Sequence, residues 1–200
     1  MFYDAVSNRH GLAHDPFKAL VAPRPIGWIS SRASDGTLNL APYSFFNAIS
    51  SDPHMVMFSS AGFKDSVANI EATGEFVCNL ATWDLREQMN KSSATVAAHV
   101  DEFALSGLTP APCQKIEAPR VAESPVAFEC KLLEIKKLVD LNGAPVGHWM
   151  VLGQVVGIHI DERYVHEGLV DVTQLKPIAR LGYRDYSVVT DVFQMTRPSG

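Results

Sequence analysis

The chain has 200 residues, of which 46% are hydrophobic and 20% charged, and its formal net charge is −5 at pH 7. This composition is typical of a globular domain that buries a sizeable core, and it excludes intrinsic disorder. The acidic balance argues against nucleic acid as a partner, because a protein that neutralises several phosphates is basic. We therefore expect one domain over residues 1–200.

Membrane and secretory segments are not expected. The first residues contain no basic stretch that leads into an apolar run, and eighteen apolar residues never follow one another. The three cysteines, Cys78, Cys113 and Cys130, are odd in number and lack close spacing, so a disulfide framework is not expected. We predict a protein of the reducing cytoplasm.

The first predicted elements form a hairpin. A strand over Ile26 to Arg32 is followed by a turn at Asp35-Gly36, a pair that accepts positive φ at both central positions of a tight turn. The chain then returns over Leu38 to Phe46, where Pro42 requires an edge strand or a bulge. After a break at Asp52-Pro53, a short strand is predicted over residues 54–59.

Two short helices flank the next predicted strand. Asp65 is a candidate cap for a helix over Ser66 to Thr73 that stops at Gly74. A strand follows over residues 75–80. Asp84 and Glu87 have the spacing of a capping box, which predicts a second helix through residue 90.

The second half of the chain predicts an irregular segment and three strands. The irregular segment covers Ala94 to Arg120, and the strands cover Val126 to Val139, Val146 to Ile160 and Tyr186 to Met195. The turn at Asn142-Gly143 joins the first two strands, and Gly153 and Gly157 indicate a bend or a close backbone approach. Many strands, tight turns and few short helices favour a closed or partly closed β-barrel.

Common catalytic motifs are absent from the sequence. It contains no Gly-x-Gly-x-x-Gly fingerprint, no Gly-x-x-x-x-Gly-Lys phosphate loop, no His-Glu-x-x-His helix and no Gly-x-Ser-x-Gly elbow. The seven histidines show no paired metal-ligand spacing and Cys-x-x-Cys is missing, so no metal site is predicted. These absences favour a protein in which a bound cofactor carries the chemistry.

Residues 23–66 combine apolar positions with many hydroxyl and amide side chains. Such groups cost free energy when they are buried unpaired, and a polar-edged ligand that carries a phosphate would use them. Turns and strand ends also favour Ser and Asn, so a purely structural explanation stays open.

The same residues carry a family resemblance. The chain closely resembles the flavin reductase-like, FMN-binding split-barrel proteins, which include flavoredoxins and the reductase components of two-component monooxygenases. The similar segments are Pro23-Arg24-Pro25-Ile26-Gly27-Trp28-Ile29-Ser30, Asp35 to Asn47, Ser50-Ser51-Asp52-Pro53, Lys64-Asp65-Ser66, Asp101-Glu102-Phe103, Gly147-His148-Trp149 and Arg180-Leu181-Gly182. The resemblance implies a mainly β split barrel with a few short helices and a homodimer with FMN near the subunit interface.

A phosphate needs a positive charge with hydroxyl and backbone donors. Lys64 and Ser66 at a helix start fit that need, with Ser59 as a second donor. Asp65 would repel the phosphate unless its side chain turns inward as the helix cap, which the family pattern favours. Without the resemblance, Lys64 is typical of a solvated surface lysine.

The isoalloxazine ring needs an apolar face and hydrogen-bond donors along its edge. Ser44 and the residues up to Ser51 would supply backbone N–H groups along a bulged strand, with the side chains of Asn47 and Ser50 toward the ring edge. Phe45 and Phe46 alternate in direction, so at most one of them faces the ring.

The remaining candidates are aromatic or basic. Trp28 would pack beside the ring, or would be a buried barrel tryptophan with its N–H satisfied. His148 corresponds to a Gly-x-His position near the nicotinamide donor in related reductases, although a lone histidine on an apolar strand is usually structural. Arg180 and Tyr183 are further candidates for the same pocket, and Lys91 is a weaker one.

The resulting hypothesis is an FMN-dependent oxidoreductase that takes a hydride from NADH or NADPH and passes electrons to free flavin or another acceptor. Its partners would be these small molecules and a monooxygenase or redox protein. The alternatives are a flavoredoxin-like electron carrier and a non-enzymatic FMN-binding protein.

Overall fold

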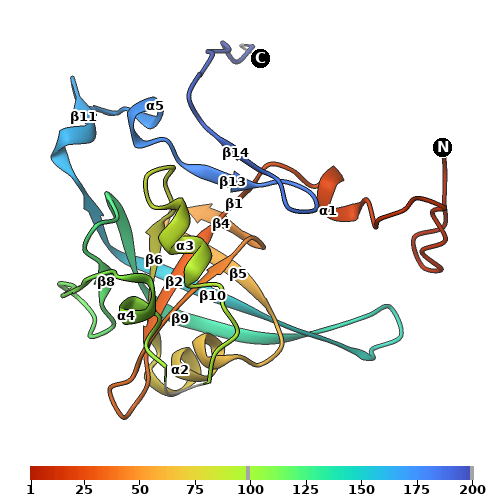
Figure 1. Ribbon diagram of the computed structural model, residues 1–200, viewed down its shortest axis with the longest axis horizontal. Helices are drawn as coiled ribbons and strands as arrows, with labels where there is room; N and C mark the ends of the chain where they lie inside the picture. Colours follow the sequence, from red (N-terminus) through yellow and green to blue (C-terminus); the bar gives the residue numbers. More distant parts are fainter. Residues whose placement is uncertain (98–99, 199–200) are drawn as a thin grey trace.

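The computed structural model describes residues 1–97 and 100–198 and is built mainly from antiparallel strands (Figure 1). One seven-stranded sheet has the order β3-β2-β6-β9-β10-β5-β4, and a smaller sheet has the order β1-β13-β14. Two-stranded ladders join β7 to β8 and β11 to β12. The strands are β1 (Arg24–Pro25), β2 (Gly27–Arg32), β3 (Leu38–Tyr43), β4 (Phe46–Ser51), β5 (His54–Ala61), β6 (Glu75–Leu80), β7 (Pro110–Ala111), β8 (Arg120–Val121), β9 (Val126–Val139), β10 (Pro145–Ile160), β11 (Val165–His166), β12 (Leu169–Val170), β13 (Ile178–Arg180) and β14 (Tyr186–Val188).

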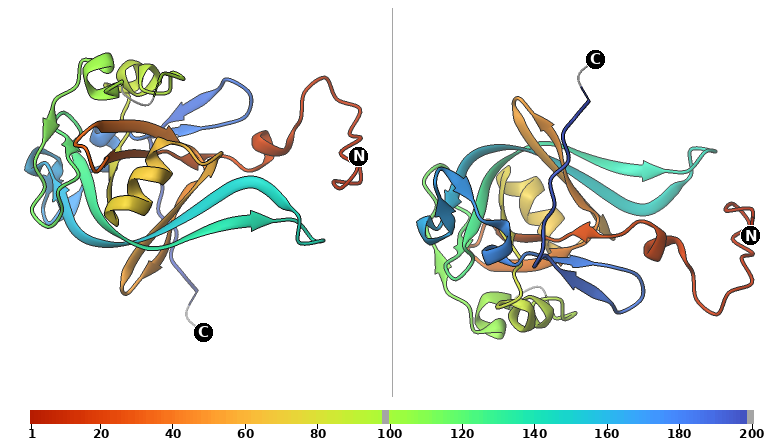
Figure 2. Two further views of the ribbon diagram at one scale, coloured as in Figure 1. Left: turned by 90° about the horizontal axis from the view of Figure 1, so that it is seen from below. Right: turned by 90° about the horizontal axis from the view of Figure 1, so that it is seen from above.

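The helices are short. They are α1 (Phe17–Leu20), α2 (Asp65–Thr73), α3 (Arg86–Lys91), α4 (Glu102–Ser106) and α5 (Val172–Leu175), with a 3₁₀ turn over Glu162–Tyr164. Helix α2 packs on one side of β2, while α3 and α4 pack on the other. The sheet curls around α2, which contacts β2, β3 and β9 (Figure 2). This curled sheet is the mainly β split barrel that the sequence predicts.

Strand β2 is buried on both faces, and this divides the core into two layers. Ile29 packs with Phe58, Phe76 and Ile70 on the α2 side. Trp28 packs with Phe103 and other residues of the α3 and α4 side. The apolar residues thus form continuous contacts through the sheet, which stabilises the barrel by removing large side chains from water.

The long hairpin of the sheet agrees closely with the sequence prediction. β9 covers the predicted residues, β10 begins one residue before the predicted start, and Gly143 has a φ of +80° in the turn. Register shifts occur at Gly153 and Gly157. A Cβ at Gly153 would lie 2.4 Å from a ring atom of Phe76, so this position requires glycine because the Phe76 ring of β6 packs against its backbone.

Other boundaries differ from the prediction. The strand predicted through residue 46 ends at Tyr43, and a separate strand, β4, begins at Phe46. At the Asp35-Gly36 turn only Gly36 has a positive φ, because the loop is wider than a two-residue turn and closes through a hydrogen bond from Ala33 N to Thr37 O. The last strand stops at Val188, seven residues before the predicted end.

The helix α2 ends at Gly74 as predicted, but the predicted N-terminal caps of α2 and α3 are wrong. The residue that precedes α3 is Leu85, and no side chain caps this helix, so Asp84 does not form a capping box. The segment predicted as irregular contains α4, whose N-terminus is capped by the Asp101 side chain through Phe103 N. The sequence signal for α4 is Asp101, an acidic residue that precedes a short apolar run.

Candidate functional site

Two neighbouring clefts lie at the C-terminal end of β3, an edge strand of the large sheet. The Lys64 cleft has a volume of about 240 Å³ and is lined by residues that include Pro42, Tyr43, Lys64, Asp65, Ser66 and Ser93. The Arg180 cleft has a volume of about 300 Å³ and is lined by residues that include Lys18, Arg24, Pro42, Ser44, Ser93 and Arg180. Because Pro42 and Ser93 line both clefts, they form one groove along the edge of β3.

Lys64 occupies the N-cap position of α2 and its side chain is exposed. Its backbone is extended, and the following residues enter the helix with their N–H groups toward the cleft end. The N-terminus of a helix carries a partial positive charge. Among the residues that the structure describes, Lys64 belongs to no ion pair, so its ammonium group is available for an anion.

The structure corrects the predicted role of Asp65. Asp65 is the first residue of α2 and not its cap, and no side chain makes a capping hydrogen bond at this end. The Asp65 side chain therefore lines the Lys64 cleft, where it is half-buried. Its negative charge raises the pKa of two neighbours, Tyr43 and Glu102, in each case as a smaller cause than burial.

Ser66 is buried, and its hydroxyl donates to Asn39 Oδ1 at 2.6 Å. The Asn39 amide in turn donates to Glu102 Oε2 at 3.0 Å, and Leu40 N donates to the same oxygen. Burial raises the pKa of Glu102 despite these hydrogen bonds. The network holds the start of α2 against β3 and α4. Ser66 therefore has a structural role at this cleft, because its hydroxyl hydrogen is already donated to Asn39.

The Arg180 cleft gathers positive charge. Arg24 is 6% exposed, and its guanidinium donates to the carbonyl oxygens of Lys18, Val21 and Leu181. Burial lowers the pKa of Arg24, and the charge of Arg180 lowers it further. Arg24 Nε is buried and has no hydrogen-bond partner among the described residues. Two arginines that repel each other in one cleft favour an anionic or carbonyl-rich ligand.

The segment between β3 and β4 follows directly after Pro42, which lines both clefts. Ser44 lines the Arg180 cleft. Phe46 points toward the core, where its ring fills the space that a Cβ on Gly27 would need. Asn47 is exposed, and its side-chain oxygen accepts from Ala48 N at 2.9 Å. The register of β4 shifts between Ala48 and Ser50, which confirms the predicted bulged strand.

Ser59 and His148 lie beyond this segment, on β5 and β10. Ser59 N donates to Phe45 O at 2.8 Å, while Ser59 Oγ is buried with no partner among the described residues. His148 pairs with Ala61 across the strands, and its ring centroid lies 6.5 Å from that of Phe45. His148 Nδ1 lies 3.1 Å from Val146 O, so Nε2 is the ring nitrogen that remains available. The Phe45 ring also lies 5.9 Å from Lys18 Nζ, which connects His148 to the Arg180 cleft.

Trp28 does not line either cleft. It is fully buried, and its Nε1 donates to Ser92 Oγ at 2.9 Å. It is the satisfied barrel tryptophan that the sequence left open as the alternative, because β2 is a central strand with core on both faces. It has no exposed surface with which to contact a ligand in this chain.

Arg180 and Tyr183 both line the Arg180 cleft, and the Arg180 guanidinium donates to Tyr183 O, whereas His148, which was predicted in the same pocket, is not among the lining residues. Lys91 is exposed at the end of α3 and lines neither cleft. The sequence reasoning missed Lys18 as a lining residue. Arg24 was quoted only within the Pro23-Arg24-Pro25 motif, and a basic residue between two prolines is the signal that pointed to it.

Comparison with known proteins assigns the family. The model described as "Flavin reductase like domain" matches residues 20–177, so the chain belongs to that family. An uncharacterized protein of Aquifex aeolicus is 36% identical over 173 residues, which cover 84% of this chain and 85% of the relative. The uncharacterized protein YwrF of Bacillus subtilis is 31% identical over 94% of this chain and 95% of its own length.

Two solved structures are similar over nearly their whole length. Nitrilotriacetate monooxygenase component B from Bacillus cereus has a TM-score of 0.88 and 28% identity, with 98% of each chain covered. Pseudomonas fluorescens 2-nitrobenzoate 2-nitroreductase NbaA has a TM-score of 0.87 and 28% identity, with 100% of this chain and 97% of that chain covered. Within the described residues, no helix has both the length and the apolar character needed to cross a bilayer.

Proposed function

We propose that this protein binds FMN in the groove formed by the Lys64 and Arg180 clefts and reduces it with NADH or NADPH. The observation that carries this proposal is a groove with basic side chains at both ends that form no ion pair with any described residue, in a chain of the flavin reductase family. When bound, FMN would accept a hydride and pass its electrons to an acceptor. The protein supplies position and electrostatics.

In this proposal the phosphate lies at the N-terminus of α2, against Lys64 and the first N–H groups of the helix. The ring lies along Ser44 to Asn47, where the backbone leaves one strand and enters the next. This orientation places the positive charge of Lys18, Arg24 and Arg180 beside the ring. Positive charge there stabilises the reduced flavin, which carries more negative charge than the oxidised form.

Buried polar atoms without partners support the fit of such a ligand. Arg24 Nε and Ser59 Oγ are unpaired among the described residues. Arg24 lines the Arg180 cleft together with Ser44, and the Ser59 backbone N–H donates to Phe45 O. A buried group of this kind costs free energy unless a ligand or water pairs with it. The carbonyl groups and ring nitrogens of a flavin are acceptors and donors of the kind required.

The nicotinamide donor would approach near His148. The available Nε2 of His148 and the neighbouring Phe45 ring offer a polar atom and an apolar surface of suitable size. Hydride transfer needs only close approach of the two rings, so we assign His148 to positioning of the donor.

A homodimer is part of the proposal. The chain beyond Val189 leaves the body of the molecule as an extended tail (Figure 1), and Phe193 and Met195 on it are 85% and 84% exposed. Exposed large apolar side chains on such a tail favour contact with a second copy. Light scattering of the full chain should give twice the monomer mass, and a chain that ends at residue 189 should give a larger monomer fraction.

The acceptor is proposed from the two similar structures. Likeness to a monooxygenase component favours delivery of reduced flavin to a partner monooxygenase. Likeness to a nitrobenzoate nitroreductase favours a second candidate, direct reduction of a small nitroaromatic acceptor. The three free thiols are compatible with work in a reducing cytoplasm.

The test is flavin binding followed by turnover. Purified protein is titrated with FMN while flavin fluorescence is recorded, and NADH or NADPH oxidation is then measured with FMN, with FMN plus a nitroaromatic, and without flavin. We expect saturable binding and flavin-dependent oxidation. Tight FMN binding with slow oxidation of both nucleotides would favour an electron carrier, and binding with no oxidation a non-enzymatic flavin protein. No flavin binding would refute the proposal.

A further inference from the structure

Three side chains with different metal-binding atoms meet on the outer face of β9 and β10, away from the groove. Cys113 Sγ, a carboxylate oxygen of Glu129 and a ring nitrogen of His159 all lie within 4.8 Å of one another. Cys113 comes from the segment after β7, Glu129 from β9 and His159 from β10. Thiolate, imidazole and carboxylate are the ligands that zinc takes in proteins.

The sheet geometry brings these residues together. Glu129 lies opposite Gly157 in the ladder of β9 and β10, and the register shifts between Val155 and Gly157. A Cβ at position 157 would lie 3.1 Å from Glu129 Cδ and 3.3 Å from Glu129 Oε1. Glycine therefore leaves space for the carboxyl group over the backbone of β10, and the bulge turns His159 toward it.

The Glu129 carboxylate is buried but keeps room for another partner. Its side chain is 1% exposed, and it accepts from Gln114 N at 2.8 Å and from Lys115 N at 2.7 Å. The third contact joins His159 Nε2 to Glu129 Oε1 at 2.6 Å. A carboxylate has about four acceptor positions, so these contacts do not exhaust it.

We propose that Cys113, Glu129 and His159 bind a divalent metal ion of the zinc type, with water as the fourth ligand. The charges of the thiolate and the carboxylate balance that of the ion. His159 also lines a surface cleft of about 450 Å³ with Arg120, Ser124 and Asp161, which gives the ion and the water a path from solvent. Three protein ligands with one open position is a common zinc arrangement.

Binding changes the protonation of two ligands. The Cys113 thiol proton is released to solvent as the metal–sulfur bond forms. The proton through which His159 Nε2 contacts Glu129 Oε1 must also leave Nε2, so that Nε2 binds the ion while Nδ1 carries the one remaining ring proton. Burial raises the pKa of Cys113 to about 12, whereas the charge and backbone N–H of Arg120 favour the thiolate. Arg120 Nε is buried without a partner among the described residues, so it remains free to donate to an anionic ligand here.

The test uses Co²⁺ as a spectroscopic probe on the full chain after dialysis against a chelator, without flavin. We expect one equivalent of Co²⁺ to bind with a thiolate-to-cobalt absorption band, and Zn²⁺ to displace it and to raise the melting temperature. Cys113→Ser should abolish the band, and His159→Gln should weaken Co²⁺ binding by at least about tenfold. Glu129 is left unchanged because it also anchors the segment that carries Cys113.

His166→Gln is the matched control, because His166 is exposed on β11 and lies outside the cluster. This variant should bind Co²⁺ like the parent chain. Circular dichroism checks that each variant is folded. If Cys113→Ser does not fold, the result for His159→Gln alone decides the outcome. Absence of Co²⁺ binding would overturn the proposal, as would a Co²⁺ affinity that neither Cys113→Ser nor His159→Gln changes.

Discussion

Two regions of this molecule are rich in polar side chains. In the first, the polar groups pair within the chain, and in the second, they face open clefts. The strap, residues 113–121, crosses the outer face of β6 and β9, and buried acids and an amide on the strands accept its backbone N–H groups. In the groove, the cations of Lys64, Lys18 and Arg180 face open clefts. A buried polar group with its partners supplied by the chain serves the fold, whereas charge that faces a cleft unpaired is available to a ligand.

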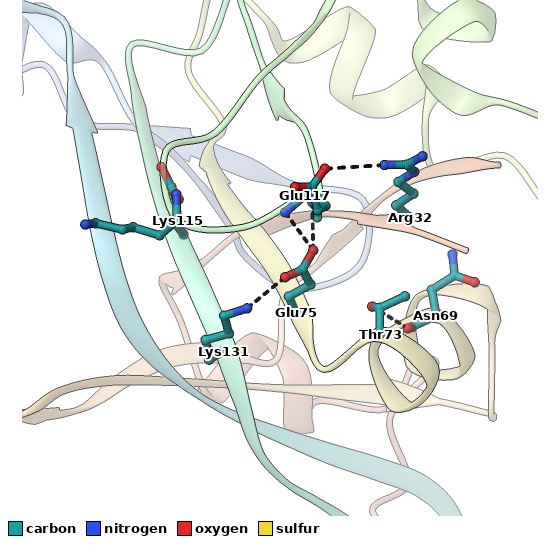
Figure 3. Close-up of polar contacts among 9 residues, drawn as sticks. Arg32, Asn69, Thr73, Glu75, Lys115, Glu117 and Lys131 are labelled. Carbon is teal, nitrogen blue, oxygen red and sulfur yellow. Dashed lines mark hydrogen bonds and ion pairs between the residues drawn. The ribbon is translucent and has the colours of Figure 1, made fainter. Parts of the chain in front are cut away.

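The strap shows how fully the chain can pair such groups. Glu75 accepts from Glu117 N at 2.7 Å and from Ala118 N at 3.1 Å, and its second oxygen lies 2.9 Å from Lys131 Nζ (Figure 3). Asn79 Oδ1 accepts from Val121 N at 2.8 Å, and Glu129 accepts from the N–H groups of Gln114 and Lys115. Alternate residues of β6 and β9 thus bind a segment that has little regular structure of its own.

The largest expected effect is the loss of one strap anchor. Glu75→Ala leaves two backbone N–H groups without their acceptor, and we expect it to lower the free energy of unfolding by about 3 kcal/mol. Urea denaturation measures this change. The matched control is Glu117→Ala, because the Glu117 side chain is 86% exposed and only pairs with Arg32 on the surface. Equal effects of the two substitutions would contradict the anchoring role.

The groove should respond in ligand affinity and not in stability. Lys64→Ala should weaken FMN binding by about tenfold, which corresponds to about 1.4 kcal/mol. Riboflavin lacks the phosphate, so its affinity should not change. Lys91→Ala is the control, because Lys91 is exposed outside both clefts. An equal loss for FMN and riboflavin would place the phosphate elsewhere, and Arg180→Ala would then be the variant that separates the two ligands.

We expect the strap and the groove to contribute to the free energy of unfolding with opposite pH dependence. Glu129 represents the strap. Burial acts to raise the pKa of Glu129, but hydrogen bonds from Gln114, His159 and Lys115 hold it below its ordinary value of 4.5. The folded protein therefore holds this proton less tightly than the unfolded chain does. The resulting stability is present above about pH 4.5 and is lost as the pH falls below it. Urea midpoints between pH 3 and 7 should show a smaller loss toward acid in Glu129→Gln.

Glu102 in the groove should behave in the opposite sense. Burial, with a smaller contribution from the Asp65 charge, raises the pKa of Glu102 above its ordinary value of 4.5. The stability linked to this proton is present below pH 4.5 and is lost as the pH rises through the raised pKa. Glu102→Gln should remove that loss. The same sign of change in both variants would contradict the contrast between strap and groove.

The smallest expected effect concerns Asp65. Its carboxylate lines the Lys64 cleft without capping α2, so it repels a phosphate held there. Asp65→Asn should strengthen FMN binding by about threefold, since the side chain is only half-buried and solvent screens its charge. The affinity for riboflavin, measured in the same way, should stay constant. Weaker FMN binding by Asp65→Asn would contradict this prediction and would show that the Asp65 carboxylate helps to position the ligand.

Local patterns predicted the elements whose signals are local. The two long strand segments, residues 126–139 and 146–160, with the Asn142-Gly143 turn pair between them, predicted the long hairpin almost to the residue. Caps were less reliable at Asp65 and Asp84, because each helix begins one residue away from the position that the pattern predicted, with Lys64 and Leu85 at the N-cap positions. The α4 helix was missed because it is short, and its stability comes from burial of Phe103 and Glu102 in the core and network.

The sequence by itself determined the strand-rich class, the position of the long hairpin, the absence of common catalytic motifs and, through its resemblance in short motifs, the family, because these depend on local residue order. Tertiary structure alone decided that Trp28 is core, that Ser66 is bound to Asn39, and that Lys18, Arg24 and Arg180 share a cleft. It also brought Cys113, Glu129 and His159 together. The physical reason is that these contacts depend on strand pairing and on bulges between distant segments, which local sequence does not specify.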